Sequence, residues 1–280
     1  MIVNIDGGFL EPGEARIPVT DGSFLYGDTL FETFKAREKK ILFSAEHLDR
    51  LELSADLLGF PFDRKRIESA LERTAQRMNR PVSRLRLTLT RGSFTGLEFP
   101  PAKAGRFVLI ATPTEEPDAA ERLQGAHCVF APNRRVNPLS HLPQLKHGNY
   151  ADCLYAMAHA RKQGAREALF VTEDDEVIEG STSNLFIVCG KSLITPPAGE
   201  LVLPGVMRRQ IMNAAADLDL ECREETIRRK DLWTADEIFL TNSLIDVLPV
   251  TQVENQTVGG GRLWQSLLQQ LQRTIDRQMQ

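Results

Sequence analysis

Four short apolar segments between residues 167 and 196 place the strongest constraint on the fold of this chain. The segments are EALFVTE, EVIEG, SNLFIV and SLITP, and each is shorter than a typical helix. Turn-forming residues separate them, namely Asp174–Asp175, the stretch 180–183 and Gly190. Short apolar runs bounded by turn residues are typical of strands joined by hairpins. The pattern therefore predicts a β meander in the second half of the chain.

The first 115 residues combine helical and strand patterns. Leu48, Leu51, Ala55 and Leu58 recur at helical spacing, with Ser44 as the expected N-cap and Gly59 in the C′ position. The segment 84–90, RLRLTLT, alternates leucine with polar residues, and 106–113 is a more continuous apolar run, so both are expected to be strands. This part of the chain is therefore predicted to be an α+β unit.

The composition changes between residues 114 and 145, where Pro, Asn, Glu and Arg dominate and a connector is expected. A length of 280 residues suits two domains. We therefore expect a smaller α+β domain, 1–118, and a larger one, 119–280. In the larger domain we expect helices at 150–163, ended by Gly164, after Pro204–Gly205, and at 262–275, with a strand at 236–242.

Composition and charge limit the function classes. A net charge of −4 gives no basic excess for nucleic acid, and no apolar run approaches the roughly 18 residues that span a bilayer. The N-terminus lacks a signal-peptide pattern, so a cytoplasmic location is expected. The cysteines, Cys128, Cys153, Cys189 and Cys222, have no metal-ligand spacing, so no metal site and buried reduced thiols are expected.

Several polar residues stand where a ligand is more plausible than core packing. Lys146 lies in a loop, where a solvated charge is the common alternative, and Glu179 ends a strand before the small, hydroxyl-rich turn 180–183. The backbone N–H groups of Val206 and Met207 open a helix after Gly205, where an anion can bind. Arg50, Thr241 and Asn242 add possible donors, each with a structural alternative as a helix-face charge or turn residue.

A reactive lysine, a carboxylate and an anion cradle together match the needs of pyridoxal 5′-phosphate. This cofactor requires a lysine for a Schiff base, a carboxylate at the pyridine nitrogen, and N–H, hydroxyl and guanidinium donors for its phosphate. Each feature alone is weak, but their combination favours this cofactor.

Seven sequence blocks resemble the fold-type IV pyridoxal-phosphate enzymes, the class IV aminotransferase family. In order they are DGSFLYGDTLFETFKA (21–36), HLDRL (47–51), LTRG (89–92), LKHGNY (145–150), VIEGSTSNLF (177–186), LPGVMRRQ (203–210) and DEIFLTNSLIDVLPV (236–250). The resemblance implies a two-domain α+β or α/β fold like that of D-amino acid aminotransferase, with the cofactor at the domain interface. It also implies a homodimer whose cleft is shared between subunits.

The resemblance assigns roles to individual residues. Lys146 takes the place of the Schiff-base lysine, and Glu179 that of the partner of the pyridine nitrogen. The phosphate ligands fall on Arg50, Val206, Met207 and Thr241, with Asn242 beside them. The family usually has threonine where Met207 stands, so only a backbone contact is expected there. Tyr150 is expected at the ring oxygen of the cofactor.

The substrate is less constrained than the cofactor. Family members acting on branched-chain L-amino acids have Lys-x-Gly-Gly-Asn-Tyr, one residue longer than the KHGN of this chain. D-amino-acid aminotransferases have tyrosine in place of Phe31 and an Arg-x-His pair that is absent after Arg91–Gly92. Either departure weakens the corresponding branch. Phe31 is thus a substrate-side candidate, and Arg91 is expected to meet the substrate carboxylate.

The remaining branch resembles 4-amino-4-deoxychorismate lyase, which releases 4-aminobenzoate and pyruvate for folate biosynthesis. FETF, KHGN and TNSL followed by proline are similar to blocks of this branch. In that reaction Lys146 is expected to carry protons. The alternatives are an aminotransferase that moves an amino group from a branched-chain or D-amino acid to an α-keto acid, and a non-catalytic protein of the same fold. In each enzymatic case the partner is a small amino substrate.

Overall fold

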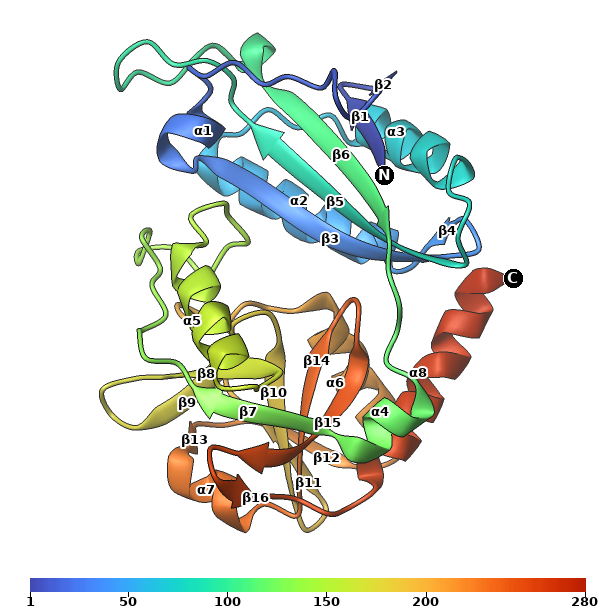
Figure 1. The fold of residues 1–280 in the computed structure, drawn as a ribbon, viewed down its shortest axis with the longest axis vertical. Coiled ribbons are helices and arrows are strands. Elements are labelled where there is room, and N and C mark those ends of the chain that lie inside the picture. Colours follow the sequence, from blue (N-terminus) through green and yellow to red (C-terminus); the bar gives the residue numbers. More distant parts are fainter. The chain divides into compact units, whose positions relative to one another are not determined.

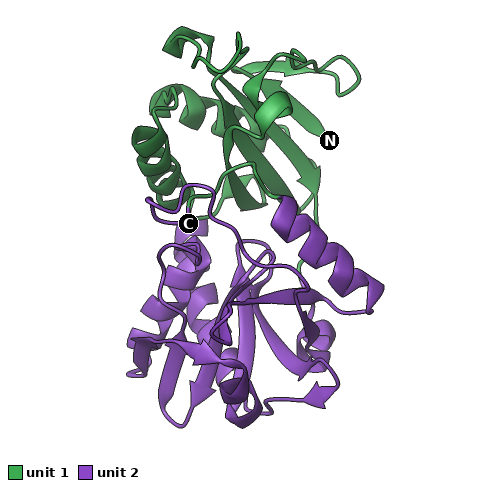
Figure 2. Cartoon of the chain, turned by 90° about the vertical axis from the view of Figure 1, so that its left-hand side faces the viewer, with its two compact units in different colours: residues 1–116, 145–150 green, residues 117–144, 151–280 purple.

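The computed structural model describes all 280 residues, and they divide into two compact units. The first unit comprises residues 1–116 and 145–150, and the second comprises residues 117–144 and 151–280 (Figure 2). The sequence predicted one division, after residue 118. In the structure the first division follows residue 116, and the later segment 145–150 also belongs to the first unit. No helix combines the length and apolar character that a membrane span requires.

The first unit is a six-stranded antiparallel sheet with two long helices (Figure 1). The strand order is β2-β1-β6-β5-β3-β4. The elements are β1 (Ile2–Ile5), β2 (Gly8–Leu10), α1 (Gly22–Tyr26), β3 (Thr29–Arg37), β4 (Lys40–Ile41), α2 (Ser44–Leu58), α3 (Arg64–Gln76), β5 (Val82–Thr90), a 3₁₀ turn (Ala102–Ala104) and β6 (Arg106–Pro113).

Strand β5 separates the core of the first unit from a polar face. Leu85, Leu87 and Leu89 are almost completely buried in the core formed with α2 and α3. Because side chains alternate along a strand, Arg84 and Arg86 lie on the opposite face. The alternation in 84–90 thus predicted both the strand and its two faces.

The limits of α2 agree with the expected helix except at its first residue. Phe43 is the N-cap, in a left-handed conformation with φ 52° and no side-chain cap, so the expected N-cap at Ser44 is wrong by one residue. The Phe43 ring is buried, so its packing holds the start of the helix although no side chain accepts a capping hydrogen bond there. Gly59 ends the helix with φ 68°, as expected for a C′ glycine.

The second unit contains a ten-stranded sheet, which is also visible in Figure 1. Its order is β12-β11-β10-β14-β15-β7-β8-β9-β13, with β16 beside β15. The elements are α4 (Ala119–Gln124), β7 (Ala126–Phe130), α5 (Ala151–Lys162), β8 (Glu167–Val171), β9 (Glu176–Gly180), β10 (Asn184–Cys189), β11 (Ser192–Thr195), α6 (Val206–Ala216), β12 (Glu221–Glu224), β13 (Ile227–Arg228), α7 (Arg229–Thr234), β14 (Glu237–Asn242), β15 (Asp246–Val253), β16 (Gln256–Thr257) and α8 (Leu263–Met279).

The predicted meander is correct in its strands but wrong in their order. β8 pairs with β9 and β10 pairs with β11, as hairpins, yet β7, β14 and β15 lie between β8 and β10. The polar groups of the turn at 181–183 bond to Glu167, and the N–H of Ser181 also donates to the carbonyl of Ala168. Local patterns cannot show this insertion, since β15 comes from residues 246–253.

The segment 114–145 is not only a connector. It contains α4 and the strand β7, which is parallel to both β8 and β15. Cys128 and Val129 are buried in β7. A five-residue strand among polar neighbours gives little local signal, and its partners are distant in the sequence.

The cysteines are less uniformly buried than the sequence predicts. Cys128 and Cys153 are buried, whereas Cys189 is exposed and Cys222 is half-buried. Cys189 is the last residue of β10, and Cys222 lies on β12 at the edge of the sheet. Neither position is enclosed by neighbouring strands, so the prediction of buried thiols is wrong for these two residues.

Candidate functional site

Within the first unit, the backbone around Lys146 pairs with the first residues of strand β3. The N–H of Phe31 donates to the carbonyl of Lys146 at 2.9 Å, and the N–H of Gly148 donates to the carbonyl of Thr29 at 2.8 Å. A β bridge between Leu30 and His147 completes the contact. The lysine therefore belongs to a short backbone-paired segment of defined position rather than to a free loop.

Two aromatic rings and a second cation surround the Lys146 side chain. Its Nζ lies 4.6 Å from the ring centroid of Phe31 and 5.9 Å from that of Tyr150, and the two rings meet edge to face. The guanidinium carbon of Arg86 lies 3.7 Å from the Phe31 ring centroid. The structure therefore brings together the predicted Lys146, Phe31 and Tyr150 and adds Arg86.

Arg84 and Arg86 form a pair of cations without an anionic partner. Neither side chain makes an ion pair, and the Nε of Arg84 is buried without a hydrogen-bond acceptor. Burial lowers the pKa of the Arg86 guanidinium, and the nearby Arg84 lowers it further. Two adjacent guanidinium groups without a carboxylate favour the binding of an external anion.

Arg50 is anchored by a buried carboxylate. Its Nε and Nη2 donate to the two oxygens of Glu32 at 2.7 Å and 2.6 Å, and His47 Nδ1 lies 2.7 Å from Glu32 Oε2. Burial raises the pKa of Glu32, but Arg50 and His47 outweigh it and lower this pKa to about 2. Burial lowers the pKa of His47, although Glu32 opposes this shift, and His47 Nδ1 donates to the ionised Glu32 carboxylate.

The contacts of Arg91 differ from those expected of a substrate ligand. Its Nε donates to Asp28, and its two terminal nitrogens donate to the carbonyls of Gly59 and Leu58. Its guanidinium also lies against the rings of Phe60 and Phe99. Arg91 thus connects the end of α2 to the loops around it, and the geometry does not favour its predicted contact with the substrate carboxylate.

In the second unit, Glu179 is the centre of a buried polar network. Its Oε1 accepts from Arg135 Nε at 2.9 Å, and its Oε2 accepts from the N–H of Leu203 at 2.9 Å and from Asn184 Nδ2 at 3.4 Å. Arg135 also donates to Asp152 at 2.6 Å. Burial lowers the pKa of Arg135, but Glu179 and Asp152 reverse this and raise the pKa. The carboxylate of Glu179 is therefore fixed in orientation by charged and polar donors.

The turn that follows Glu179 is held by a second buried carboxylate, Glu167. Its Oε1 accepts from the N–H and hydroxyl of Ser181, and its Oε2 from the N–H and hydroxyl of Thr182 and the hydroxyl of Ser183. Glu167 is only 3% exposed. The polar groups of the hydroxyl-rich turn surround the Glu167 carboxylate, and this one carboxylate holds the turn in place.

The N-terminus of α6 and Thr241 provide donors that fit a phosphate. Gly205 caps α6 without a side-chain hydrogen bond, which leaves the first N–H groups, at Val206 and Met207, without intrahelical acceptors. The hydroxyl of Thr241 is fully buried and has no hydrogen-bond partner. Thr241 pairs across the sheet with Asn184, whose side chain contacts Leu203 and closely approaches Gly205. An orphaned hydroxyl near an uncapped helix suits an anionic group.

Met207 and Asn242 are two of the predicted cofactor-binding residues, and their side chains have structural roles. Met207 is 2% exposed, so only its backbone can meet a ligand. Asn242 donates to the carbonyl of Thr182 and accepts from the N–H groups of Leu244 and Ile245. Asn242 therefore shapes the loop after β14.

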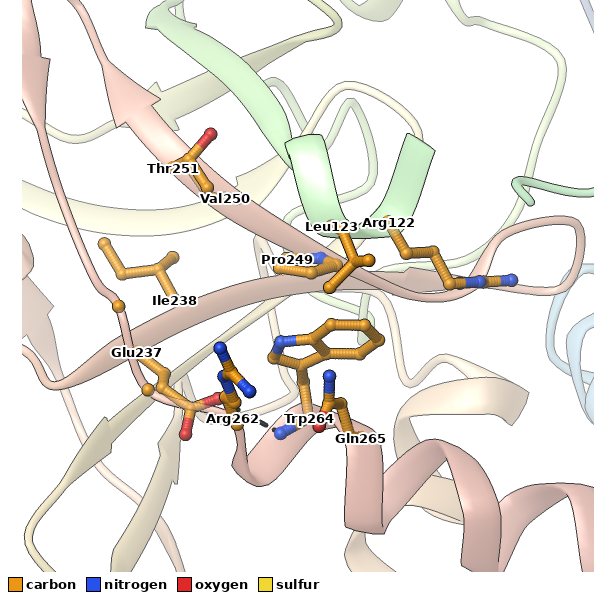
Figure 3. A pocket seen from close by; sticks show the side chains of 12 residues that line it. Arg122, Leu123, Glu237, Ile238, Pro249, Val250, Thr251, Arg262, Trp264 and Gln265 are labelled. Atoms are coloured by element: carbon orange, nitrogen blue, oxygen red, sulfur yellow. Dashed lines mark hydrogen bonds between the residues drawn. The ribbon is translucent and has the colours of Figure 1, made fainter. Parts of the chain in front are cut away.

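A cavity of about 190 Å³ in the second unit lies apart from these residues. Figure 3 shows Trp264 and Arg262 on one side of it and Pro249 and Leu123 on the other. Glu237 accepts from the N–H of Trp264 and thereby caps α8. Glu237 and Thr241 stand near opposite ends of β14, and no predicted site residue lines this cavity.

Sequence patterns did not identify four residues that the structure places in these networks. They are Arg86, Arg135, Asn184 and Glu167. For Arg86 a signal existed, because a charged residue within a half-buried strand must lie on its non-core face. Arg135 lies in a segment with the composition of a connector. Asn184 belongs to a block of the family resemblance, but the resemblance assigns it no role.

The chain matches the family model for amino-transferase class IV over residues 29–253. It is 29% identical over 261 residues to a putative branched-chain-amino-acid aminotransferase of Methanocaldococcus jannaschii, covering 92% of this chain and 90% of that one. The 4-amino-4-deoxychorismate lyase of Pseudomonas aeruginosa superposes with a TM-score of 0.86 at 27% identity, covering 98% and 99% of the two chains. The branched-chain amino acid aminotransferase of Escherichia coli gives a TM-score of 0.86 at 25% identity, covering 96% and 92%.

These matches confirm the predicted fold type IV, enzymatic activity and pyridoxal 5′-phosphate as the cofactor. The family model covers most of the chain, including Lys146 and Glu179. The chain belongs to the class IV aminotransferase family.

Proposed function

We propose that this enzyme is a 4-amino-4-deoxychorismate lyase, which forms 4-aminobenzoate and pyruvate. The observation that carries the proposal is the pair Arg84 and Arg86 on β5, which has no carboxylate partner; Arg86 lies against the Phe31 ring beside Lys146. The proposed substrate carries one carboxylate on its ring and one on its enolpyruvyl group. Two guanidinium groups match such a dianion better than they match an aliphatic side chain. The lyase of Pseudomonas aeruginosa has the same fold over nearly its whole length.

The residues have distinct proposed roles. Bound pyridoxal phosphate supplies an electron-accepting ring that stabilises negative charge on the substrate. Lys146 holds the cofactor covalently and later moves a proton at its Nζ. Glu179 keeps the pyridine nitrogen protonated, and Tyr150 donates to the ring oxygen.

The phosphate has its own proposed ligands. The N–H groups of Val206 and Met207 and the hydroxyl of Thr241 donate to it. Arg50 adds a positive charge, and the two hydrogen bonds from Arg50 to Glu32 fix the direction of its side chain.

An aminotransferase is the second candidate, because the chain is similar to branched-chain enzymes over most of its length. For this reaction, Arg84 and Arg86 would bind a dicarboxylate amino acceptor such as 2-oxoglutarate. The lyase differs in requiring no amino acceptor. The lyase and the aminotransferase therefore form different products, which an assay of the purified enzyme can distinguish.

Product analysis tests the proposal. Purified enzyme is incubated with aminodeoxychorismate alone, and separately with L-leucine or D-alanine plus 2-oxoglutarate. We expect 4-aminobenzoate and pyruvate in equal amounts from the first mixture and little glutamate from the others. Repeated turnover to glutamate without 4-aminobenzoate would establish the aminotransferase instead.

The role of Lys146 is tested independently of the substrate. Borohydride reduction of the holoenzyme should attach the cofactor to Lys146, detected by peptide mass spectrometry. Lys146→Ala should abolish both labelling and turnover. A label on another lysine would contradict the assignment.

We also propose that the enzyme is a cytoplasmic homodimer. Phe24, Leu97 and Phe99 of the first unit are 72%, 85% and 70% exposed, and these are apolar side chains that a second copy of the chain would cover. Light scattering should give twice the 31.4 kDa chain mass, and Phe24→Asp with Leu97→Asp should reduce it. A wild-type monomer of full activity would contradict the dimer, and cell fractionation tests the location.

A further inference from the structure

We propose that Asn184 is a positioning residue that couples the carboxylate of Glu179 to the phosphate-binding end of α6. The inference rests on the proposed roles of Glu179 and of the Val206–Met207 N–H groups. It concerns how the two ends of the cofactor site are held at a fixed separation within the second unit.

The side chain of Asn184 reaches both ends of this part of the site. Its Nδ2 donates to the carbonyl of Leu203 at 2.9 Å and lies 3.4 Å from Glu179 Oε2. The N–H of Leu203 donates to the same Glu179 oxygen at 2.9 Å. Glu179, Asn184 and Leu203 therefore form a closed set of polar contacts, in which the amide bridges a carboxylate and a backbone carbonyl.

The other polar atom of the amide lies against the cap of α6. A Cβ atom built on Gly205 would lie 2.0 Å from Asn184 Oδ1, so a larger residue at position 205 would displace the Asn184 side chain. Gly205 is the N-cap of α6, and its neighbours Val206 and Met207 supply the proposed phosphate donors. The position of Asn184 thus limits where the helix can begin.

Thr241 extends the coupling to the neighbouring strand. Asn184 and Thr241 are direct partners across β10 and β14, so their side chains share one face. Asn184 is 6% exposed and Thr241 is fully buried. Because both side chains are enclosed, a displacement of Asn184 would change the geometry around the unpartnered Thr241 hydroxyl as well as that of Glu179.

Two substitutions of Asn184 test the proposal, and a substitution of another asparagine is the control. Asn184→Asp keeps the size of the side chain but cannot donate, and it places a negative charge beside Glu179 and the Leu203 carbonyl. Asn184→Ser is the milder variant and is measured beside Asn184→Asp. The control is Asn213→Asp, at an exposed position on α6.

Three measurements on apoenzyme reconstituted with pyridoxal phosphate test the proposal. Two of them report separately on the ring end and the phosphate end of the site. Titration with pyridoxal phosphate should show a loss of affinity of about 10- to 100-fold in both Asn184 variants, the expected result of losing two buried hydrogen bonds. The visible absorbance band reports the ring, and the ³¹P chemical shift reports the phosphate. We expect both to change in Asn184→Ser, whereas Glu179→Gln should change mainly the band and Thr241→Ala mainly the ³¹P shift.

The possible outcomes are distinct. If the Asn184 variants change only one of the two signals, or neither, Asn184 does not couple the two ends and the inference is overturned. A failure of the proposed function shows itself separately, because borohydride would then leave Lys146 unlabelled in the wild-type enzyme. Asn213→Asp should match the wild type in all three measurements.

Discussion

The guanidinium of Arg86 lies 3.7 Å from the ring centroid of Phe31, and the ammonium of Lys146 lies 4.6 Å from the same centroid. One aromatic ring therefore attracts two cations, which partly offsets the repulsion between them. The arrangement favours a substrate that brings a negative charge into this region. Phe31 was expected beside the substrate, and the structure adds its contacts with Arg86 and Lys146.

Replacing Arg86 by methionine should weaken substrate binding more than catalysis. The loss of one charge-assisted contact corresponds to about a 10- to 100-fold rise in KM for a dicarboxylate substrate. Steady-state kinetics measure this, with Arg106→Met at an exposed position of β6 as the control. An unchanged KM would show that the substrate carboxylates bind elsewhere.

Glu32 should make stability depend on pH in the acid range. Its folded pKa of about 2 lies below the ordinary value of 4.5, so ionised Glu32 stabilises the folded state above pH 4.5. This contribution, roughly 3 kcal/mol at most, is lost as the pH falls from the ordinary pKa towards the folded one. Denaturant unfolding between neutral pH and acid pH measures it.

The variant Glu32→Gln isolates this effect. It should be less stable than the wild type at neutral pH, and its stability should fall less steeply below the ordinary glutamate pKa of 4.5. Glu72→Gln, at an exposed position on α3, should retain the wild-type slope. An equal slope for Glu32→Gln would assign the acid sensitivity to other carboxylates.

Removal of the Glu167 carboxylate should destabilise the second unit. Glu167→Ala leaves the Ser181 and Thr182 N–H and hydroxyl groups without their buried acceptor. We expect a loss of about 3–5 kcal/mol in the free energy of unfolding. Thermal and urea unfolding measure the loss. Glu173→Ala, in an exposed ion pair, should change stability by less than about 1 kcal/mol.

Adding a methyl group at Gly148 should displace the Lys146 segment. A Cβ there would lie 1.9 Å from the hydroxyl of Thr29 and 3.0 Å from the carbonyl of Gly27. Gly148→Ala should therefore reduce turnover by about 10-fold or more, with partial recovery in combination with Thr29→Ala. Gly199→Ala meets no atom within 4 Å and is the control. Full activity of Gly148→Ala would show that the segment tolerates the shift.

The parts of the fold that the sequence predicted are those determined by nearby residues. The faces of β5 follow from the alternation in RLRLTLT, and the end of α2 follows from Gly59. The insertion of β7, β14 and β15 into the expected meander depends on pairing between residues as distant as Ala126 and Val250, for which a single sequence carries no local signal.

The same distinction applies to the candidate site. Lys146 and Glu179 could be predicted as site residues because each lies in a distinctive block, and their roles stay predictions. Arg135 could not, because its role depends on contacts with Glu179 and Asp152, which lie 44 and 17 residues away. Arg91 illustrates the opposite case, since a strand-end arginine looks like a ligand until its three acceptors are known.

The strict alternation along β5 also bears on how such enzymes diversify. Its leucines face the interior, and its arginines face away from it, so substitutions at positions 84 and 86 leave the interior packing intact. Under the proposed roles of Arg84 and Arg86, substitutions on one side of this single strand would change the substrate while the backbone stays the same.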